Sequence, residues 1–246
     1  MPWFFPIIAY LVGSIPFGVL IAKSKGIDIT QHGSGNVGAT NVFRVVGKGF
    51  GILCLFLDFL KGFVPVVIAI NLLRVQGETP PVPLPFLWGL SDEISIDRQL
   101  AIHTSQVATA MAAILGHNYS LFLRGKGGKG IATSAGVLVA LMPLVLLGML
   151  IVFIITLFSS GYVSLGSMGG AISLPILRHL GDRFRHVDGD SSLPTLWDSG
   201  TWNKPLFIFA LVVCVLALWR HRSNIQRIRA GTEARVMRGK KTEHES

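Results

Sequence analysis

A loop near the N-terminus carries residue types that can bind an anion. Residues 33–41 read GSGNVGATN, and an apolar segment lies on each side of them. Glycines allow successive backbone N–H groups to turn inward toward one point, and neutral hydroxyl and amide side chains add hydrogen bonds without repelling a phosphate. We therefore predict an anion-binding loop at a membrane surface. Gly33 and Gly35 would shape this loop, with side-chain donors from Ser34, Asn36, Thr40 and Asn41.

The same letters satisfy the GxGxxG pattern of dinucleotide-binding folds. That pattern requires a preceding strand, a following helix and an acidic ribose ligand about 20 residues later. Here the chain enters an apolar segment after the loop, so the sequence disfavours a dinucleotide site.

A second loop, residues 124–130, combines three basic residues with four glycines in the sequence RGKGGKG. It follows Gly116 and His117 and precedes a predicted helix, and both lysines and a helix N-terminus favour a bound phosphate. It is not a Walker A loop, because Leu123 stands at the early glycine position and Gly130 stands where a hydroxyl residue is required. Topology alone would explain the basic residues, but the interleaved glycines favour an anion site. Its residues would be Lys126, Gly127, Gly128 and Lys129.

A third polar stretch, HRSNIQRIRAGTE at residues 221–233, follows the last apolar segment. On a continuing helix, His221 and Asn224 lie on one face at positions i and i+3, and Gly231 is typical of a helix end. A lone histidine at a membrane interface is more often structural than catalytic. Two other polar loops on the same predicted side of the membrane favour a catalytic role here.

The elements that must position these loops are predicted to be transmembrane helices. Half of the 246 residues are hydrophobic and 14% are charged, against about 25% charged in a typical soluble domain. Mean hydropathy is +0.57. Apolar runs approach or exceed the length that a helix needs to cross about 30 Å of hydrocarbon. They cover residues 3–22, 50–73, 105–123, 131–158, 162–177 and 205–220, so we expect an all-α polytopic membrane protein.

Basic residues set the predicted orientation. The loops 23–49 and 124–130 and the tail from residue 220 are rich in Lys and Arg, whereas the loop 74–104 carries a small acidic excess. Basic loops remain in the cytoplasm, which places the N-terminus outside and the C-terminus in the cytoplasm.

The number of crossings must agree with that orientation. Six crossings would put the basic tail outside. We therefore predict that Pro143 divides the run 131–158 into two short antiparallel helices, because proline removes a helix hydrogen bond. This gives seven transmembrane helices and an external loop at 178–204. The alternative is one long helix kinked at Pro143.

Several other functions are disfavoured. Cys54 and Cys214 lie inside apolar runs, so the sequence indicates neither a disulfide framework nor a zinc site. No cluster of histidines and carboxylates suggests a metal ion. The net charge of +9 is explained by topology and by attraction to anionic lipid, so we expect no nucleic acid. An anion or phosphate-ester transporter is the alternative class, because Asp58 and Lys61 lie within an apolar run. A transporter would, however, place its polar residues at the midplane rather than at one interface.

Together, the three polar stretches resemble the three signature motifs of the bacterial acyl-phosphate:glycerol-3-phosphate acyltransferase family. GSGNVGATN, GHNYSLFLRGKGGKGIAT and HRSNIQRIRAGTE occur in the family's order and interval pattern. The resemblance covers most of residues 1–233, as a single integral membrane acyltransferase domain. It leaves residues 234–246 as a predicted disordered cytoplasmic tail. Gly125 departs from the pattern, which has a bulky apolar residue before the lysine-glycine run.

This resemblance implies a seven-helix protein of the bacterial inner (plasma) membrane with its active site on the cytoplasmic side. It implies transfer of a fatty acyl group from acyl phosphate to the sn-1 hydroxyl of glycerol 3-phosphate, which yields lysophosphatidate and phosphate in the first step of phospholipid synthesis. The expected partners are these two substrates, membrane lipid and the soluble enzyme that makes acyl phosphate. No cofactor or metal is expected.

The chemistry explains the residue types. An acyl phosphate is an activated donor, so the enzyme must orient a hydroxyl and neutralise growing negative charge. A covalent intermediate at Ser34 is disfavoured, because no GxSxG elbow surrounds it. His221 would orient the acceptor or take its proton, with Asn224 fixing the histidine or binding the glycerol; a phosphate oxygen of a substrate is the alternative base.

The expected roles fall into two sets. The catalytic set is His221, Asn224, Ser34 and Lys126. The substrate-binding set is Gly33, Ser34, Gly35, Asn36, Thr40, Asn41, Arg44, Lys126, Gly127, Gly128 and Lys129.

Overall fold

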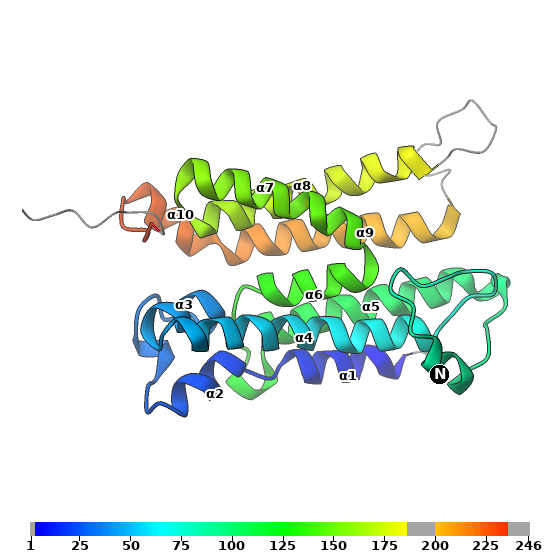
Figure 1. Ribbon diagram of the computed structural model, residues 1–246, viewed down its shortest axis with the longest axis horizontal. Coiled ribbons are helices and arrows are strands. Elements are labelled where there is room, and N and C mark those ends of the chain that lie inside the picture. The colour runs from blue at the N-terminus through cyan, green and yellow to red at the C-terminus, as the bar shows by residue number, and fades with distance from the viewer. Residues whose placement is uncertain (1–2, 186–199, 236–246) are drawn as a thin grey trace, which may run out of the picture.

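The computed structural model describes residues 3–185 and 200–235, and this part of the chain is almost entirely helical (Figure 1). The α-helices are α1 (Phe4–Gly13), α2 (Phe17–Lys23), α3 (Ala39–Val45), α4 (Lys48–Leu72), α5 (Gln99–Asn118), α6 (Ile131–Leu141), α7 (Pro143–Ser160), α8 (Val163–Arg185), α9 (Gly200–Arg220) and α10 (Arg222–Arg229). Short 3-10 helices cover Ile29–Gln31, Pro85–Leu90, Ile96–Arg98 and Leu121–Leu123. Within the described residues, the β structure is one isolated bridge between Val75 and Ile94.

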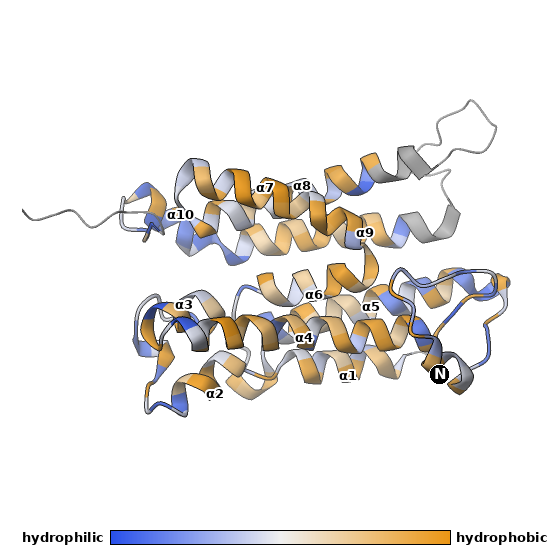
Figure 2. Ribbon diagram, in the orientation of Figure 1, coloured by the Kyte–Doolittle hydropathy of each residue, from blue (hydrophilic) through white to orange (hydrophobic). Residues whose placement is uncertain are grey.

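The long helices form two groups with roughly parallel axes (Figure 1). In one group α1 packs against α5 and α4 packs against α6, and in the other α7 packs against α8 and α8 against α9. Contacts between α5 and α9 join the groups. Hydrophobic residues follow the length of both groups, whereas hydrophilic residues gather at the ends and in the loops (Figure 2). This is the pattern of helices that face lipid.

Close helix contacts depend on glycine in the first group. A Cβ atom added to Gly62 of α4 would overlap the carbonyl oxygen of Thr133, and one added to Gly136 of α6 would overlap the carbonyl oxygen of Phe59. Small residues allow two helix backbones to approach in this way, which is a common device in membrane proteins. The short helix α6 is thereby held against α4, and its N-terminus is fixed beside the 124–130 loop.

The predicted break at Pro143 is confirmed. Residues 131–158 form two helices, α6 and α7, and Figure 1 shows the chain reversing direction between them. Met142 separates the two with an extended φ of −148°, and Pro143 occupies the first turn of α7, where a missing N–H is tolerated. The structure excludes one continuous helix.

The apolar run 3–22 is also divided, which the sequence analysis did not predict. Helix α1 ends at Gly13 and α2 begins at Phe17, after Pro16. The carbonyl oxygens exposed at this break are satisfied from elsewhere in the fold. Ser120 Oγ donates to the Ser14 carbonyl at 2.5 Å, and Lys61 Nζ donates to the Ile15 carbonyl at 2.8 Å. The break therefore provides partners for polar groups inside the bundle.

Composition alone identifies only part of the membrane-spanning helices. Among the described residues, three helical stretches are long and apolar enough to cross a membrane: Phe4–Lys23, Lys48–Leu72 and Pro143–Ser160. Helix α9 with α10 is a fourth if the pair, bent by 47°, is taken as one span. Helix α5 is less apolar because its buried face carries polar residues, among them His103, Gln106 and Thr109. These side chains are buried inside the protein rather than exposed to lipid.

Candidate active site

The three polar motifs meet at one cavity of about 320 Å³. Each motif contributes lining residues, and further lining residues come from α4, α5, α7 and α8. Those singled out by sequence are Ser34, Asn36, Thr40, Asn41, Arg44, Lys129, His221 and Asn224, and others include Asp58, His117, Ser164, Ser167, Arg227 and Glu233. Segments almost 200 residues apart in the chain are thus brought together.

Asn41 organises the first loop. Its side chain is 2% exposed, accepts a hydrogen bond from the Ser34 N–H at 2.9 Å and donates to the carbonyl groups of Ile29, His32 and Asn36. The amide of Asn41 therefore closes the loop that contains Gly33 and Gly35, both of which have positive φ. The buried environment explains why a residue with both donors and an acceptor stands at this position.

The prediction that the backbone N–H groups of this loop turn toward an anion is wrong for three of them. The N–H groups of Ser34, Gly35 and Gly38 donate within the loop, to Asn41 Oδ1, the His32 carbonyl and Asn36 Oδ1. Gly33 and Gly35 serve the local turn geometry instead, because both have positive φ, which glycine adopts without strain. The polar side chains of Ser34, Asn36 and Thr40 line the cavity and can meet a ligand there.

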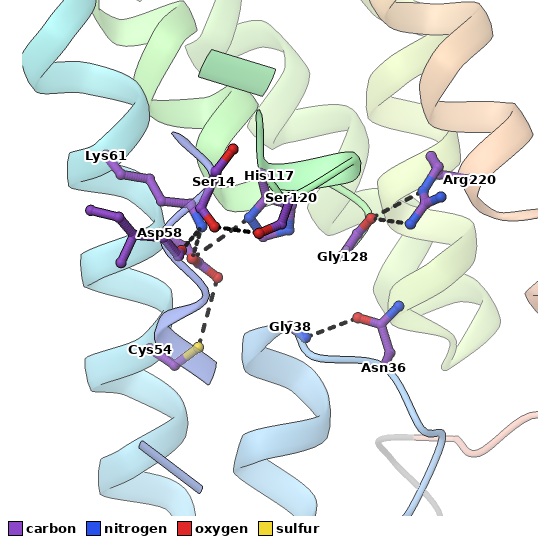
Figure 3. A network of polar contacts seen from close by, with 11 residues as sticks. Ser14, Asn36, Gly38, Cys54, Asp58, Lys61, His117, Ser120, Gly128 and Arg220 are labelled. Atoms are coloured by element: carbon purple, nitrogen blue, oxygen red, sulfur yellow. Dashed lines mark hydrogen bonds and ion pairs between the residues drawn. The ribbon is translucent and has the colours of Figure 1, made fainter. Parts of the chain in front are cut away.

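The second loop is held from both sides. Arg220, the last residue of α9, donates to the Gly128 carbonyl at 2.6 Å (Figure 3). It also donates to the Gly127 carbonyl at 2.7 Å. On the other side, the Gly128 N–H donates to the His117 carbonyl at 3.1 Å. A Cβ atom at Gly128 would overlap His117 Nε2, so only glycine fits here. The carbonyl groups of this segment are therefore turned toward Arg220, and Lys129 follows directly.

The two lysines of the second loop lie in different environments. Lys129 is partly buried and lines the cavity, whereas Lys126 is exposed and is not among the lining residues. Gly127 and Gly128 shape the loop without lining the cavity, as Gly33 and Gly35 do in the first loop. The structure thus places Lys129, and not Lys126, with the residues of the other two motifs.

Lys129 joins the second motif to the third. Its Nζ donates to Asn224 Oδ1 at 2.5 Å, and Asn224 Nδ2 donates to Glu233 Oε1 at 2.6 Å. Glu233 Oε2 accepts from Arg227 Nε at 2.7 Å, and Oε1 accepts from Ser164 Oγ at 3.0 Å. A continuous network therefore runs from Lys129 through an amide to a carboxylate.

The charges in this network are set by burial and by their partners. Burial lowers the pKa of Lys129 to about 8, helped by Arg227, Arg44 and Arg220 and opposed by Glu233. Burial alone would raise the pKa of Glu233, but hydrogen bonds from Arg227, Asn224 and Ser164 outweigh it and hold that pKa below its usual range. Glu233 is therefore ionised at neutral pH. Lys129 is mostly protonated at neutral pH and loses its proton as the pH rises through about 8.

His221 is a neutral imidazole at neutral pH. Burial, followed by the positive charge of Lys129, lowers the pKa of His221 to about 4. Its Nδ1 lies 2.7 Å from the Ala217 carbonyl oxygen. Because a carbonyl oxygen only accepts, Nδ1 carries the proton, and Nε2 keeps its lone pair. The ring can therefore accept a proton at Nε2.

An apolar groove adjoins the cavity. It lies among α6, α7, α8 and α9, has a volume of about 90 Å³ and shares Ile131, Phe153 and Ser167 with the cavity lining. Leu138, Leu146, Leu150 and Val213 are among its other lining residues. An amphiphile with an anionic head could place that head in the cavity and the start of its chain in this groove.

Several participants were missed by the sequence interpretation. Arg220 was counted only as one of the basic tail residues, and Ser164 gave no signal because it lies in an apolar run. Glu233 stands inside the third motif, and its distance of nine residues from Asn224 could have suggested a contact just past the helix end. Among the described residues, no three His, Cys, Asp or Glu side chains are grouped so that they could hold a metal ion.

Sequence comparisons identify relatives over nearly the whole chain. A family model described as Glycerol-3-phosphate acyltransferase matches residues 3–231. The chain is 39% identical over 225 residues to the glycerol-3-phosphate acyltransferase of Geotalea daltonii, which covers 92% of each protein. It is 38% identical over 232 residues to the enzyme of the same name from Aquifex aeolicus, with 94% of this chain and 97% of the relative covered.

Solved structures agree with the sequence relatives. The chain is similar to the crystal structure of PlsY, an integral membrane glycerol 3-phosphate acyltransferase, in its glycerol 3-phosphate form. The identity is 36%, the TM-score is 0.71, and 95% of this chain and 94% of that chain are covered. The lysophosphatidic acid form of PlsY gives a TM-score of 0.69 at the same identity. These findings confirm the resemblance that the three motifs indicated: the chain is an all-helical membrane protein that belongs to the glycerol-3-phosphate acyltransferase family.

Proposed function

We propose that this protein transfers a fatty acyl group from acyl phosphate to the sn-1 hydroxyl of glycerol 3-phosphate. The hydroxyl oxygen attacks the acyl carbon, an ester bond forms, and the bond from that carbon to the phosphate oxygen breaks. The hydroxyl loses its proton and inorganic phosphate leaves. The products are lysophosphatidate and phosphate, and the reaction is the first step of phospholipid synthesis.

The convergence of the three motifs on one cationic cavity carries this proposal. Both substrates bear a phosphate group, and the cavity lining includes Arg44, Lys129 and Arg227 but only two carboxylates, Asp58 and Glu233, each paired with a basic residue. The apolar groove beside the cavity suits a substrate with a fatty acyl chain. Cations placed where charge develops on a leaving phosphate supply the kind of stabilisation that acyl transfer requires.

We assign the central phosphate contact to Lys129. Its amine lies in the cavity, and Arg44, Ser34, Asn36 and Thr40 line the same space from the first motif. Lys126, which the sequence analysis placed at the centre of catalysis, is assigned a smaller part: it adds positive potential at the exposed surface of the loop. Asn41 stabilises the first loop through hydrogen bonds from its buried amide to backbone groups.

The acceptor hydroxyl needs a base, and His221 is our assignment. Its Nε2 has a lone pair, and the low pKa keeps the ring neutral. Asn224 holds Lys129 and lies one helical turn from His221, so it positions the cation beside the base. A phosphate oxygen of a substrate is the alternative proton acceptor.

The membrane arrangement follows from the same convergence. We propose seven crossings, formed by α1 with α2, by α4, by α5 and by α6, α7, α8 and α9. Helix α6 is short for a crossing, and its packing on α4 compensates. The basic loops that border the cavity then face the cytoplasm of a bacterial inner membrane, where a soluble enzyme can deliver acyl phosphate. The predicted loop 178–204 is too long, because residues 178–185 belong to α8 and residues 200–204 to α9. Its remainder, and residues 236–246 of the predicted tail, lie outside the described residues.

Cysteine labelling tests this orientation. Starting from a variant with Cys54 and Cys214 replaced by Ala, a single cysteine is introduced at Phe86, which is 75% exposed, or at Lys126. With a membrane-impermeant maleimide on intact cells, we expect labelling of the Phe86→Cys variant at once. The Lys126→Cys variant should be labelled only after the cells are permeabilised. Labelling of Lys126→Cys in intact cells would contradict the proposed orientation.

The pKa of Lys129 predicts how substrate binding depends on pH. Only the protonated amine attracts a phosphate, so affinity for glycerol 3-phosphate should be full below the pKa of about 8. It should fall as pH rises above that value, by up to about tenfold per pH unit. Isothermal titration calorimetry between pH 6.5 and about 9.5 measures this. The Lys129→Arg variant should move the decline to higher pH, because arginine stays charged. An affinity of the native protein that does not change up to the highest pH would show that Lys129 is not the anion ligand.

An acyl-transfer assay tests the activity itself. Purified protein in lipid or detergent is incubated with glycerol 3-phosphate and palmitoyl phosphate, with palmitoyl-CoA as the matched donor. We expect formation of lysophosphatidate with palmitoyl phosphate alone. Product formation from palmitoyl-CoA would show that the acyl donor is not restricted to acyl phosphate and would change that part of the proposal. Uptake of glycerol 3-phosphate into vesicles without any product would favour a transporter instead.

A further inference from the structure

A buried charged pair, Asp58 and Lys61, lies on α4, and the reaction described above does not use it. Asp58 lines the cavity, and Lys61 lies beside it. Asp58 is 2% exposed and Lys61 is 4% exposed, and Lys61 Nζ lies 2.7 Å from Asp58 Oδ1. Charged residues inside membrane helices are energetically expensive and are usually kept for a function. Lys61 Nζ also donates to the Ile15 carbonyl at 2.8 Å, at the break between α1 and α2.

Asp58 faces His117 across the helix interface. His117 Nδ1 lies 3.6 Å from Asp58 Oδ1, and both residues line the cavity (Figure 3). Cys54 Sγ approaches the other carboxylate oxygen at 3.7 Å. The aspartate is therefore placed between a cation fixed to the α1–α2 break and a histidine at the end of α5.

His117 in turn touches the second loop at two points. Its carbonyl oxygen accepts the Gly128 N–H, and its ring lies so close to Gly128 that a Cβ atom there would overlap Nε2. From the opposite side, Arg220 binds the carbonyl groups of Gly127 and Gly128. Gly127 and Gly128 are thus held in place by contacts to His117 and Arg220, and the residue that follows them is Lys129.

The His117 ring lies between Asp58 and the second loop. Its Nδ1 faces the Asp58 carboxylate, and its Nε2 lies on the side of Gly128, where an added Cβ atom would overlap it. The ring serves as a rigid block between the aspartate and the loop.

We propose that Asp58, Lys61 and His117 are positioning residues, which hold the Gly127–Gly128 segment in place so that the Lys129 amine stays in the cavity. Lys61 has a second task, because it offsets the negative charge of Asp58 next to a site that must attract phosphate. This inference rests on the proposed function, since it concerns the geometry of the same cavity. Misplacing a catalytic group by about 1 Å can lower a rate by about 10²-fold.

The Asp58→Asn variant tests this proposal with two measurements. We expect kcat/KM for glycerol 3-phosphate to fall by about 10- to 100-fold. We also expect Lys129 to react faster with an amine-modifying reagent, measured by mass spectrometry against the exposed Lys48 as internal reference. The matched control is Asn71→Ala, which removes a fully buried polar side chain at the other end of α4, where it binds the Val82 carbonyl and the Leu84 N–H. It should lower thermal stability without changing Lys129 labelling.

Charge compensation provides a second test. Lys61→Met leaves Asp58 without its cation, so it should lose more activity than the double variant Asp58→Asn/Lys61→Met, while Lys61→Arg should keep most activity. If the Asp58→Asn variant does not fold, the double variant is used in its place for the labelling and activity measurements. Unchanged labelling and activity in Asp58→Asn, or equal losses in Asp58→Asn and Asn71→Ala, would overturn the proposal. Failure of the native protein to form lysophosphatidate would instead reject the proposed function.

Discussion

Replacing Lys129 by Met is expected to lower kcat/KM for glycerol 3-phosphate by at least about 10³-fold, equivalent to about 4 kcal/mol. The substitution keeps the length of the apolar stem and removes the cation that donates to Asn224 Oδ1 in the cavity. Loss of a single preorganised donor to a developing negative charge lowers kcat by about 10²- to 10³-fold. Here the loss of ground-state attraction for phosphate adds to that effect. Initial rates of lysophosphatidate formation measure it.

Two other lysines separate a local effect from a general loss of charge. Lys126→Met should lower kcat/KM by no more than about tenfold, because its exposed amine acts only through screened charge. Lys48, exposed at the start of α4, is outside the cavity, and Lys48→Met should leave the rate within about twofold of the native protein. A larger loss in Lys126→Met than in Lys129→Met would return the central phosphate contact to the residue that the sequence favoured.

Replacing His221 by Gln is expected to lower kcat by about 10²- to 10⁴-fold, the usual contribution of a general base. Glutamine can still donate a hydrogen bond to the Ala217 carbonyl, which His221 Nδ1 contacts at 2.7 Å, so the helix end should stay intact. What it lacks is a basic nitrogen for the acceptor hydroxyl. Steady-state kinetics with both substrates saturating isolate this effect from binding.

Binding of glycerol 3-phosphate provides the control for His221. The His221→Gln variant should bind this substrate within about threefold of the native affinity, since the phosphate contacts of Lys129 and Arg44 are retained. Near-native kcat would show that a substrate phosphate oxygen takes the proton. Loss of both binding and turnover would instead assign His221 to the architecture of the cavity.

Most of the architecture was predictable from two signals, apolar length and proline. The division of residues 131–158 followed from Pro143 and from the need to return the basic tail to the side of the other basic loops, and the structure has it. The break between α1 and α2 at Pro16 involves the same residue type. It was missed because the run 3–22 was short enough for a single crossing, so nothing demanded a second helix.

The sequence alone could not show whether Lys126 or Lys129 lies in the cavity. Both lysines stand in one glycine-rich loop, three residues apart. Which of them enters the cavity depends on Gly130, whose positive φ of 77° precedes α6, and on Arg220, which fixes the preceding carbonyl groups. Arg220 itself was hidden among the basic residues that positive-inside topology already explains. The contacts of a basic residue beyond a membrane helix cannot be read from charge alone.

The role of Asn41 was also only partly predictable. An asparagine in a glycine-rich loop suggested either loop shaping or a hydrogen bond to a ligand. The structure buries its side chain, which binds four backbone groups in and just before the loop. The direction of the side chain decides between these two roles. A loop has no helical or strand periodicity, so the sequence alone does not indicate which way the side chain points.

A crystal structure with glycerol 3-phosphate bound tests the central claim most directly. If the three motifs form one site, the phosphate will lie within hydrogen-bonding distance of Lys129, with a side chain from the first motif beside it and the glycerol hydroxyl facing His221 or Asn224. A phosphate bound away from Lys129, or held by residues of only one motif, would contradict the account.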